Sequence, residues 1–145
     1  MIGRRRAVLA GAAALAAPAL VRPARATPRE VAEQIARVTG GRTPQPGRVK
    51  LDLAQMVENG NAVGMTVSAD APEGGRVESL HVFAEGNPNP EVVHAVFGPA
   101  SFAPKLSTRI RLANSQTVVA VAVMEDGSCW TDSVTVLVTL AACLE

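Results

Sequence analysis

Aromatic side chains are scarce in this chain, and the common catalytic motifs are missing from it. Tyrosine is absent, and aromatic residues make up only 3% of the 145 positions, so no platform for stacking sugars or bases is expected. The sequence has no Gly-x-Ser-x-Gly elbow and no glycine-rich phosphate loop. We therefore predict that the chain is not an enzyme, and we predict no catalytic residue and no cofactor.

Residues that bind metals are also few. Histidine occurs twice, as His81 and His94, and both lie in strand-like segments. No cysteine or carboxylate stands at a recurring metal-ligand spacing from either of them. A structural role is the better expectation for each histidine, and no metal site is predicted.

The N-terminal segment has the pattern of an export signal. Arg4-Arg5-Arg6 precedes an apolar run of 14 residues, from Ala7 to Leu20, and Ala24-Arg25-Ala26 closes the segment. The run is shorter than the roughly 18 to 20 residues that a membrane-spanning helix needs, so cleavage before Thr27 is favoured over a retained anchor. The arginines resemble a twin-arginine signal, although a merely positive N-terminal region is the alternative. This predicts a signal over residues 1–26 and a periplasmic protein exported by the twin-arginine route.

Loss of this segment would reverse the net charge. The chain has 14 Lys and Arg against 13 Asp and Glu, a net charge of +1. Five of the arginines lie in residues 1–26, which leaves nine basic against 13 acidic side chains, a net charge of −4. Nucleic acid is therefore not an expected partner, and no membrane association is expected after cleavage.

A short amphipathic helix and a connector are predicted over residues 27–47. Thr27 is suited to cap the helix, Pro28 to occupy its first position and Glu30 to complete a capping box. Apolar residues then follow at helical spacing: Val31, Ile35 and Val38. Gly40-Gly41 would end the helix, and residues 42–47, with two prolines, would form a stiff connector.

The period of the apolar residues changes to two over residues 48–140, where seven segments are rich in Val, Leu, Ile or Thr. They are residues 48–53, 61–69, 76–84, 92–97, 105–112, 116–124 and 131–140. Turn residues separate them, for example Glu58-Asn59-Gly60-Asn61. The pattern predicts an all-β fold, an immunoglobulin-like β-sandwich of about seven strands, and a small barrel is the alternative.

The alternation within these strands predicts which faces are buried. Residues 105–112 alternate, with Arg109 and Arg111 on the polar face, where a solvated face or a guarded strand edge is favoured over an anion site. Residues 116–124 and 134–140 are apolar at nearly every position. They are expected to be covered on both faces, by the second sheet and by a partner subunit.

Two cysteines lie at opposite ends of the last predicted strand. Cys129 and Cys143 are 14 residues apart, which is about 40 Å or more in an extended chain, so they can form a disulfide only if the tail doubles back. Cys129 is expected to be a small buried hydrophobic residue. Cys143 is expected to be a free and accessible thiol on a flexible arm, residues 141–145, that is held from one side only.

Several segments closely match a known family. They are Glu58-Asn59-Gly60-Asn61, residues 81–85 with Asn87-Pro88, residues 107–113, residues 115–122 and Asp126-Gly127-Ser128 before Trp130-Thr131. Together these segments resemble SoxY over about residues 49–143. The resemblance implies a periplasmic carrier of bacterial sulfur oxidation with an immunoglobulin-like sandwich and a SoxZ partner. It also implies that the C-terminal cysteine, here Cys143, holds sulfur intermediates covalently while partner enzymes process them.

The residues around Cys143 differ from the SoxY arm, which ends Gly-Gly-Cys-Gly-Gly. Here the flanking residues are Ala141, Ala142, Leu144 and Glu145, which resembles a SoxY-related group ending Ala-Ala-Cys-Ile-Glu. Because alanine restricts the backbone and adds a Cβ atom, this arm should be stiffer and wider. Leu144 would supply an apolar handle for a receiving pocket. The carboxylates of Glu145 and the chain end disfavour the thiolate, so the thiol is expected to stay quiet until it docks in a basic pocket.

Two classes of function follow from these features. The first is a carrier that pairs with a SoxZ-like subunit in a heterodimer and presents a thiosulfate-like sulfur intermediate on Cys143 to periplasmic sulfur-oxidation enzymes. The second is a non-carrier scaffold whose terminal cysteine forms intermolecular disulfides. Replacement of Cys143 by serine separates them, because a carrier would lose all function and a scaffold would keep its partner.

Overall fold

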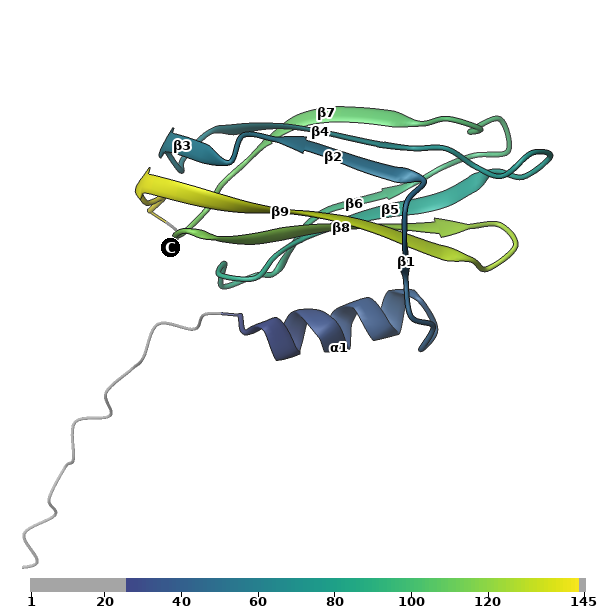
Figure 1. Cartoon of the computed structure of the whole chain (residues 1–145), viewed down its shortest axis with the longest axis horizontal. Helices are drawn as coiled ribbons and strands as arrows, with labels where there is room; N and C mark the ends of the chain where they lie inside the picture. The colour runs from purple at the N-terminus through teal and green to yellow at the C-terminus, as the bar shows by residue number, and fades with distance from the viewer. Residues whose placement is uncertain (1–25, 144–145) are drawn as a thin grey trace, which may run out of the picture.

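The computed structural model of this protein describes residues 26–143, which form two β-sheets packed face to face and one helix (Figure 1). The larger sheet has the order β1 (Gln45–Pro46), β9 (Cys129–Leu140), β8 (Gln116–Met124), β5 (Val77–Ala84) and β6 (Glu91–Val96), and β3 (Met56–Asn59) also pairs with β9. The smaller sheet has the order β2 (Val49–Leu53), β4 (Val63–Ala69) and β7 (Lys105–Ile110). All pairs are antiparallel except β1 with β9 and β3 with β9, which are parallel.

The predicted all-β, immunoglobulin-like sandwich with a short N-terminal helix is confirmed. The seven predicted strands correspond to β2 and β4 to β9, with ends within two residues of those predicted. The predictions for two segments were wrong in part. The connector over residues 42–47 contains β1, and the predicted turn at residues 58–61 begins inside β3. Both short strands exist because the long β9 offers them unpaired backbone groups, which local sequence cannot reveal.

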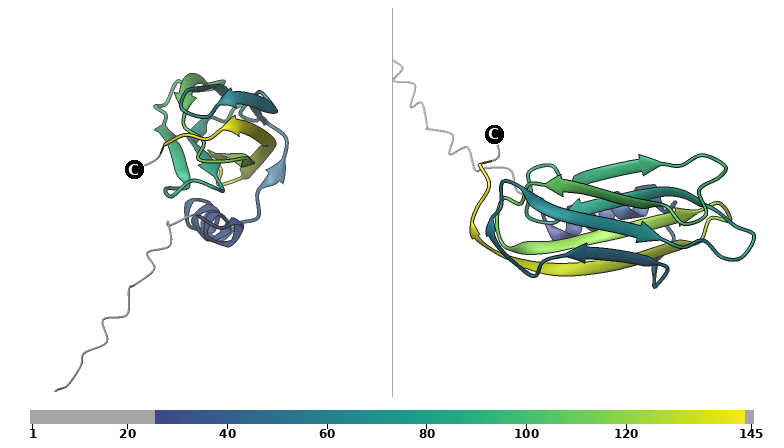
Figure 2. Two further views of the ribbon diagram at one scale, coloured as in Figure 1. Left: turned by 90° about the vertical axis from the view of Figure 1, so that its left-hand side faces the viewer. Right: turned by 90° about the horizontal axis from the view of Figure 1, so that it is seen from above.

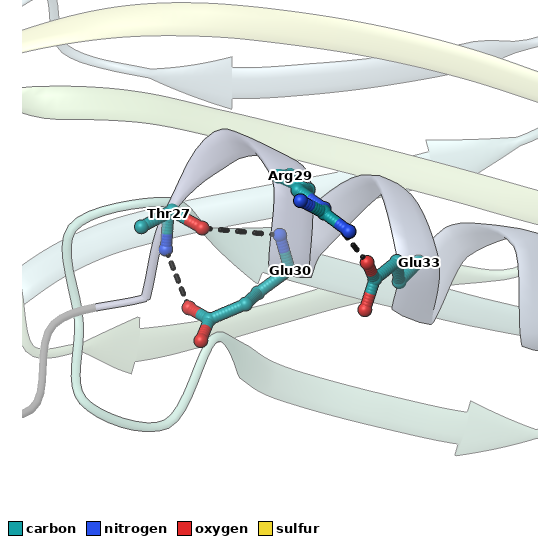
Figure 3. Close-up of polar contacts among 4 residues, drawn as sticks. All are labelled: Thr27, Arg29, Glu30 and Glu33. Atoms are coloured by element: carbon teal, nitrogen blue, oxygen red, sulfur yellow. Dashed lines mark hydrogen bonds and ion pairs between the residues drawn. The ribbon is translucent and has the colours of Figure 1, made fainter.

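The helix α1 (Pro28–Val38) starts with the predicted capping box (Figure 3). The Thr27 hydroxyl accepts a hydrogen bond from the Glu30 amide at 3.3 Å, and the Glu30 carboxylate accepts one from the Thr27 amide at 2.7 Å. An exposed ion pair between Arg29 and Glu33, at 3.1 Å, contributes little to the stability of the helix. The helix is therefore stabilised locally at its start, and Gly40 follows its end with a φ of 64°.

The helix covers the outer face of the larger sheet (Figure 1). Val31 is buried against Phe83 of β5 and Val121 of β8. This contact explains why β8 is apolar on nearly every position. The expected cover on both faces is present for β8, but the chain's own helix supplies it where a partner subunit was expected. Residues 134–140 have no such cover within the described part of the chain, since Thr135, Leu137 and Thr139 are exposed on their outer face.

The main core lies between the two sheets. Strands of the smaller sheet bury alternate residues, as in β2, where Val49, Leu51 and Leu53 point inward and Lys50 and Asp52 do not. The half-buried face predicted for residues 105–112 is also present, since Ile110 and Leu112 are buried while Arg109 and Arg111 are exposed. Both arginines lie on the solvated side of the fold.

The C-terminal arm begins at one end of the sandwich, where β9 ends. Strand β9 runs the length of the larger sheet and leads to Cys143 at the same end as the β3–β4 turn (Figure 2). The predicted export signal falls almost entirely on residues 1–25, outside the described residues, and so do Leu144 and Glu145. Among residues 26–143, no helix is long and apolar enough to cross a membrane.

Candidate functional site: the arm root and the Cys143 thiol

The two thiols of the chain lie at opposite ends of β9, and both are free. Cys129 opens the strand and is buried, with its thiol directed at the Gly127 carbonyl oxygen at 3.5 Å. Burial raises the pKa of the Cys129 thiol, which makes it a poor nucleophile. Cys143 lies three residues beyond the strand and is exposed. Only Cys143 is therefore placed to react with a partner molecule.

The first residues of the arm lie against the end of the sandwich. Ala142 is buried, and its amide donates to the Leu112 carbonyl oxygen at 3.1 Å. The amide of Cys143 donates to the side-chain oxygen of Asn61 at 3.3 Å. Ala141 is exposed. Hydrogen bonds from the main-chain amides of Ala142 and Cys143 thus hold the backbone on both sides of the Ala142 Cα atom, while Cys143 is exposed.

Gly60 makes this arrangement possible. Its amide donates to the Leu140 carbonyl at 2.8 Å, and its carbonyl accepts from the Leu112 amide at 2.9 Å. A Cβ atom on Gly60 would stand 2.4 Å from the Leu112 oxygen and 2.9 Å from the Ala142 nitrogen. Because these neighbours are backbone atoms, they cannot swing aside, so the close approach requires glycine.

The Asn61 side chain is held in place by its neighbour in the same turn. The side-chain oxygen of Asn59 accepts hydrogen bonds from the Asn61 backbone amide at 2.9 Å and from the Asn61 side-chain amide at 3.0 Å. Because the nitrogen of the Asn61 amide is held by Asn59, the oxygen is directed toward the arm. Asn59-Gly60-Asn61 is therefore a preformed cradle for the arm, which we call the arm cradle.

A buried amide supports the other side of this site. Asn87 donates to the Arg111 carbonyl at 2.7 Å and accepts from the Ala113 amide at 2.9 Å, so it fixes the main chain on both sides of Leu112. The Gln116 side chain donates to the same Asn87 oxygen at 3.0 Å and accepts from the Gly86 amide at 2.7 Å. Asn87 thus positions the carbonyl that Ala142 contacts.

Apolar side chains are exposed beside the arm root. Met56 of β3 lies directly beside Leu137 of β9, and Asn59 lies beside Leu140. More than half of the surface of each of the three apolar side chains is exposed, up to 68% for Met56. Met56 and Leu137 share one face, whereas Leu140 lies three residues beyond Leu137 and points to the other face of β9. We call the neighbouring pair Met56 and Leu137 the β3–β9 patch. Large apolar residues exposed side by side are typical of a protein interaction surface.

Sequence reasoning identified Cys143 and the arm but missed most of the residues that position it. Gly60, Asn61 and Asn87 lie in segments that carry the family resemblance, which was the available signal. The residues of the arm cradle act through contacts with residues of the arm that are 80 or more positions away in the chain, as Asn61 does with Cys143. Arg109 and Arg111 are exposed, and among the described residues their side chains make no ion pair.

Comparison with known proteins gave a family and a fold. The family model of sulfur oxidation protein SoxY matches residues 35–143, three quarters of the chain. The sulfur carrier protein SoxY from Chlorobium limicola f thiosulfatophilum is similar in structure, with a TM-score of 0.65 and 24% identity over 77% of this chain and 98% of that one. A candidate superoxide reductase from Thermotoga maritima is similar with a TM-score of 0.52 and 19% identity over 62% and 84% of the two chains. Both likenesses concern the fold. No match was found among curated proteins.

Proposed function

Because this chain belongs to the SoxY family, we propose that it is a sulfur-oxidation carrier that holds a sulfur intermediate covalently on Cys143 and presents it to partner enzymes. The observation that carries this proposal is the placement of Cys143. It is the exposed thiol of the described residues, it lies beyond the last strand, and the family match extends to it. Cys129 is buried and does not offer a second attachment point.

The attachment chemistry follows from the thiol. Joining the Cys143 sulfur to the outer sulfur of a thiosulfate-like anion forms an S–S bond, and the thiol loses its proton. The step also removes two electrons from the two sulfurs together, so an electron-accepting partner enzyme has to take them. The chain's own contribution is to present the sulfur in solvent on a backbone that Asn61 and Leu112 hold.

A SoxZ-like subunit is the proposed permanent partner, and the β3–β9 patch is the surface proposed for it. The patch lies near the arm root, because Leu137 is three residues before Leu140, whose carbonyl accepts the hydrogen bond from the Gly60 amide. A partner there would bury the apolar side chains and also border the thiol. Replacement of Leu137 by Asp should abolish copurification, whereas the same change at exposed Thr135, on the same strand face but outside the patch, should not.

The periplasm, reached through a twin-arginine signal over residues 1–26, is the proposed compartment. Fusion of residues 1–26 to a reporter that is active only after folded export tests this. Export that is lost when Arg4-Arg5-Arg6 becomes Lys-Lys-Lys supports the proposal, and unchanged export contradicts it.

Intact-mass measurement of the protein taken from its own cells during growth on thiosulfate tests the carrier proposal. A carrier shows added masses of sulfur, sulfonate or thiosulfonate on the peptide that contains Cys143, and none after Cys143→Ser. A bare thiol under every growth condition contradicts it. Disulfide-linked pairs of chains as the main species would support the scaffold alternative.

A further inference from the structure

Two histidines and a glutamate converge on the β5–β6 hairpin, far from the arm. His81 of β5 lies opposite His94 of β6, and their rings stack with centroids 4.5 Å apart and planes 26° apart. The His81 Nδ1 atom lies 2.7 Å from a carboxylate oxygen of Glu91, the first residue of β6. One potential ligand atom from each of the three residues lies within 4.8 Å of the other two.

One of the three side chains is buried and two are exposed, so a metal ion from solvent could reach them. His81 is 4% exposed, on the same sheet face as Phe83, which packs under α1. The second ring nitrogen of His81, Nε2, lies 3.0 Å from the Ser79 hydroxyl. Glu91 and His94 are exposed, and no hydrogen bond to the His94 ring occurs among the described residues. A purely structural role explains the hydrogen bond between His81 and Glu91. It does not explain His94, whose two ring nitrogens are both available to bind a ligand.

We propose that His81, Glu91 and His94 form a binding site for a divalent transition-metal ion of the zinc type. The ion would take the place of the proton between His81 Nδ1 and Glu91. The Nε2–H group of His81 would then donate to Ser79, which fixes the tautomer and the ring orientation as outer-shell partners of metal-bound histidines do. His94 would supply the third ligand.

Small side-chain movements would bring the donors to the spacing required, with the exposed His94 ring moving inward because the three ligand atoms lie within 4.8 Å of one another. Two ligand atoms about 2.0 to 2.1 Å from a tetrahedral zinc ion lie roughly 3.3 Å apart. The His81–Glu91 pair, at 2.7 Å, has to open by roughly 0.6 Å, and the exposed Glu91 side chain is free to make that adjustment. Two imidazoles and one carboxylate suit zinc and its transition-metal neighbours, whereas calcium and magnesium prefer oxygen ligands alone. Three protein ligands leave a fourth position for water or a small ligand.

This site is separate from the Cys143 thiol. His81 stands level with Val121 of β8, whereas the arm lies beyond Gln116, where that strand begins. Five residues of strand separate the two levels, which is about 16 Å. Cys143, held at the arm cradle, is therefore too far away to be a ligand of the metal site. Metal binding at this site does not depend on the carrier function of Cys143.

Zinc titration of the full chain by calorimetry tests the proposal, with Cys143→Ser as the background because an exposed thiol also binds zinc. We expect one zinc ion per chain. His94→Ala and Glu91→Gln should each weaken binding by about tenfold or more, and Ser79→Ala by about tenfold. Val96→Ala is the matched control, since Val96 is exposed on the same strand and face as His94, and it should bind zinc as the background does.

Cobalt(II) provides a second measurement, because its visible absorption reports the number and kind of its ligands. The Cys143→Ser protein should give the spectrum of a low-coordinate nitrogen and oxygen site, and His94→Ala should lose it. Circular dichroism checks that each variant is folded. No zinc binding by the background protein, or binding that His94→Ala and Glu91→Gln leave unchanged, would overturn the proposal.

Discussion

The two ends of β9 carry the same side chain in opposite settings. At the start of the strand, Cys129 is buried behind the Asp126-Gly127-Ser128 turn, and burial raises the pKa of its thiol. Beyond the other end, Cys143 is exposed on a backbone held by Asn61 and Leu112. The comparison shows that burial and tethering, more than residue type, decide which thiol can serve as an attachment point.

The largest expected effect concerns the thiols themselves. Cys143→Ser should abolish the labelling of the folded protein by iodoacetamide, however slow that labelling is, because Cys129 is buried. Cys129→Ser is the control and should leave labelling at one thiol per chain. Mass spectrometry of labelled peptides measures both. Labelling of Cys129 in the folded Cys143→Ser protein would contradict the view that burial makes this thiol unreactive.

Gly60→Ala should have the next largest effect. The added Cβ atom meets backbone atoms of Leu112 and Ala142 at 2.4 and 2.9 Å, so we expect a loss of about 3 kcal/mol in the free energy of unfolding. Gly64→Ala is the matched control, since no atom lies within 4 Å of its added Cβ, and it should change stability by less than about 0.5 kcal/mol. Urea denaturation measures both, and equal losses would contradict the proposed close packing of the arm.

Asn87→Ala tests the support of the arm root from the other side. The change leaves the Arg111 carbonyl and the Ala113 amide without their partner, so we expect the free energy of unfolding to fall by about 2 kcal/mol. Hydrogen exchange should also show faster exchange of the Ala142 amide, because the Leu112 carbonyl that it contacts is no longer fixed. Unchanged exchange at Ala142 would mean that Asn87 stabilises the loop without positioning the arm.

Asn61→Ala should act on the arm alone. It removes the acceptor for the Cys143 amide, an exposed contact that we expect to contribute under about 1 kcal/mol to global stability. Amide exchange at Cys143 should rise while exchange within β9 stays constant, as measured by hydrogen exchange with mass spectrometry. Unaltered exchange at Cys143 would show that the arm cradle does not hold the arm in solution.

The smallest effect is expected at the start of β9, at acid pH. Hydrogen bonds from the Ser128 hydroxyl and backbone amide lower the pKa of Asp126 below its ordinary value of 3.8. Because the folded pKa lies below the unfolded one, this contact stabilises the fold above pH 3.8 and is lost as the pH falls through the folded pKa. The stability difference between the wild type and Ser128→Ala should therefore be largest at neutral pH and shrink in acid. A difference that is independent of pH would contradict this.

Local signals were sufficient for the regular elements and for the exposed thiol. Thr27, Pro28 and Glu30 predicted the start of α1, and period-two alternation predicted the seven main strands. The position of Cys143 predicted a free thiol beyond the sandwich. Each of these inferences depends on residues that are close together in the chain, where backbone preferences and side-chain spacing act directly.

Contacts between distant segments were beyond such reasoning. Strand β3 exists because β9 presents a backbone edge to it, and the outer face of β8 is apolar because α1 covers it. The convergence of His81, Glu91 and His94 depends on the register of β5 with β6. A shift of one residue in that register would send one histidine to the other face of the sheet, so strand pairing decides whether the cluster exists.

The sequence by itself therefore determined the all-β fold class, the capped helix and the identity of the exposed thiol, because these follow from local chemistry and composition. Only the tertiary structure decided that the Ala142–Cys143 peptide lies in the arm cradle, that Gly60 cannot be replaced there, and that two histidines meet a glutamate. Each of these depends on atoms brought together from segments far apart in the chain, whose spacing is set by sheet register and packing.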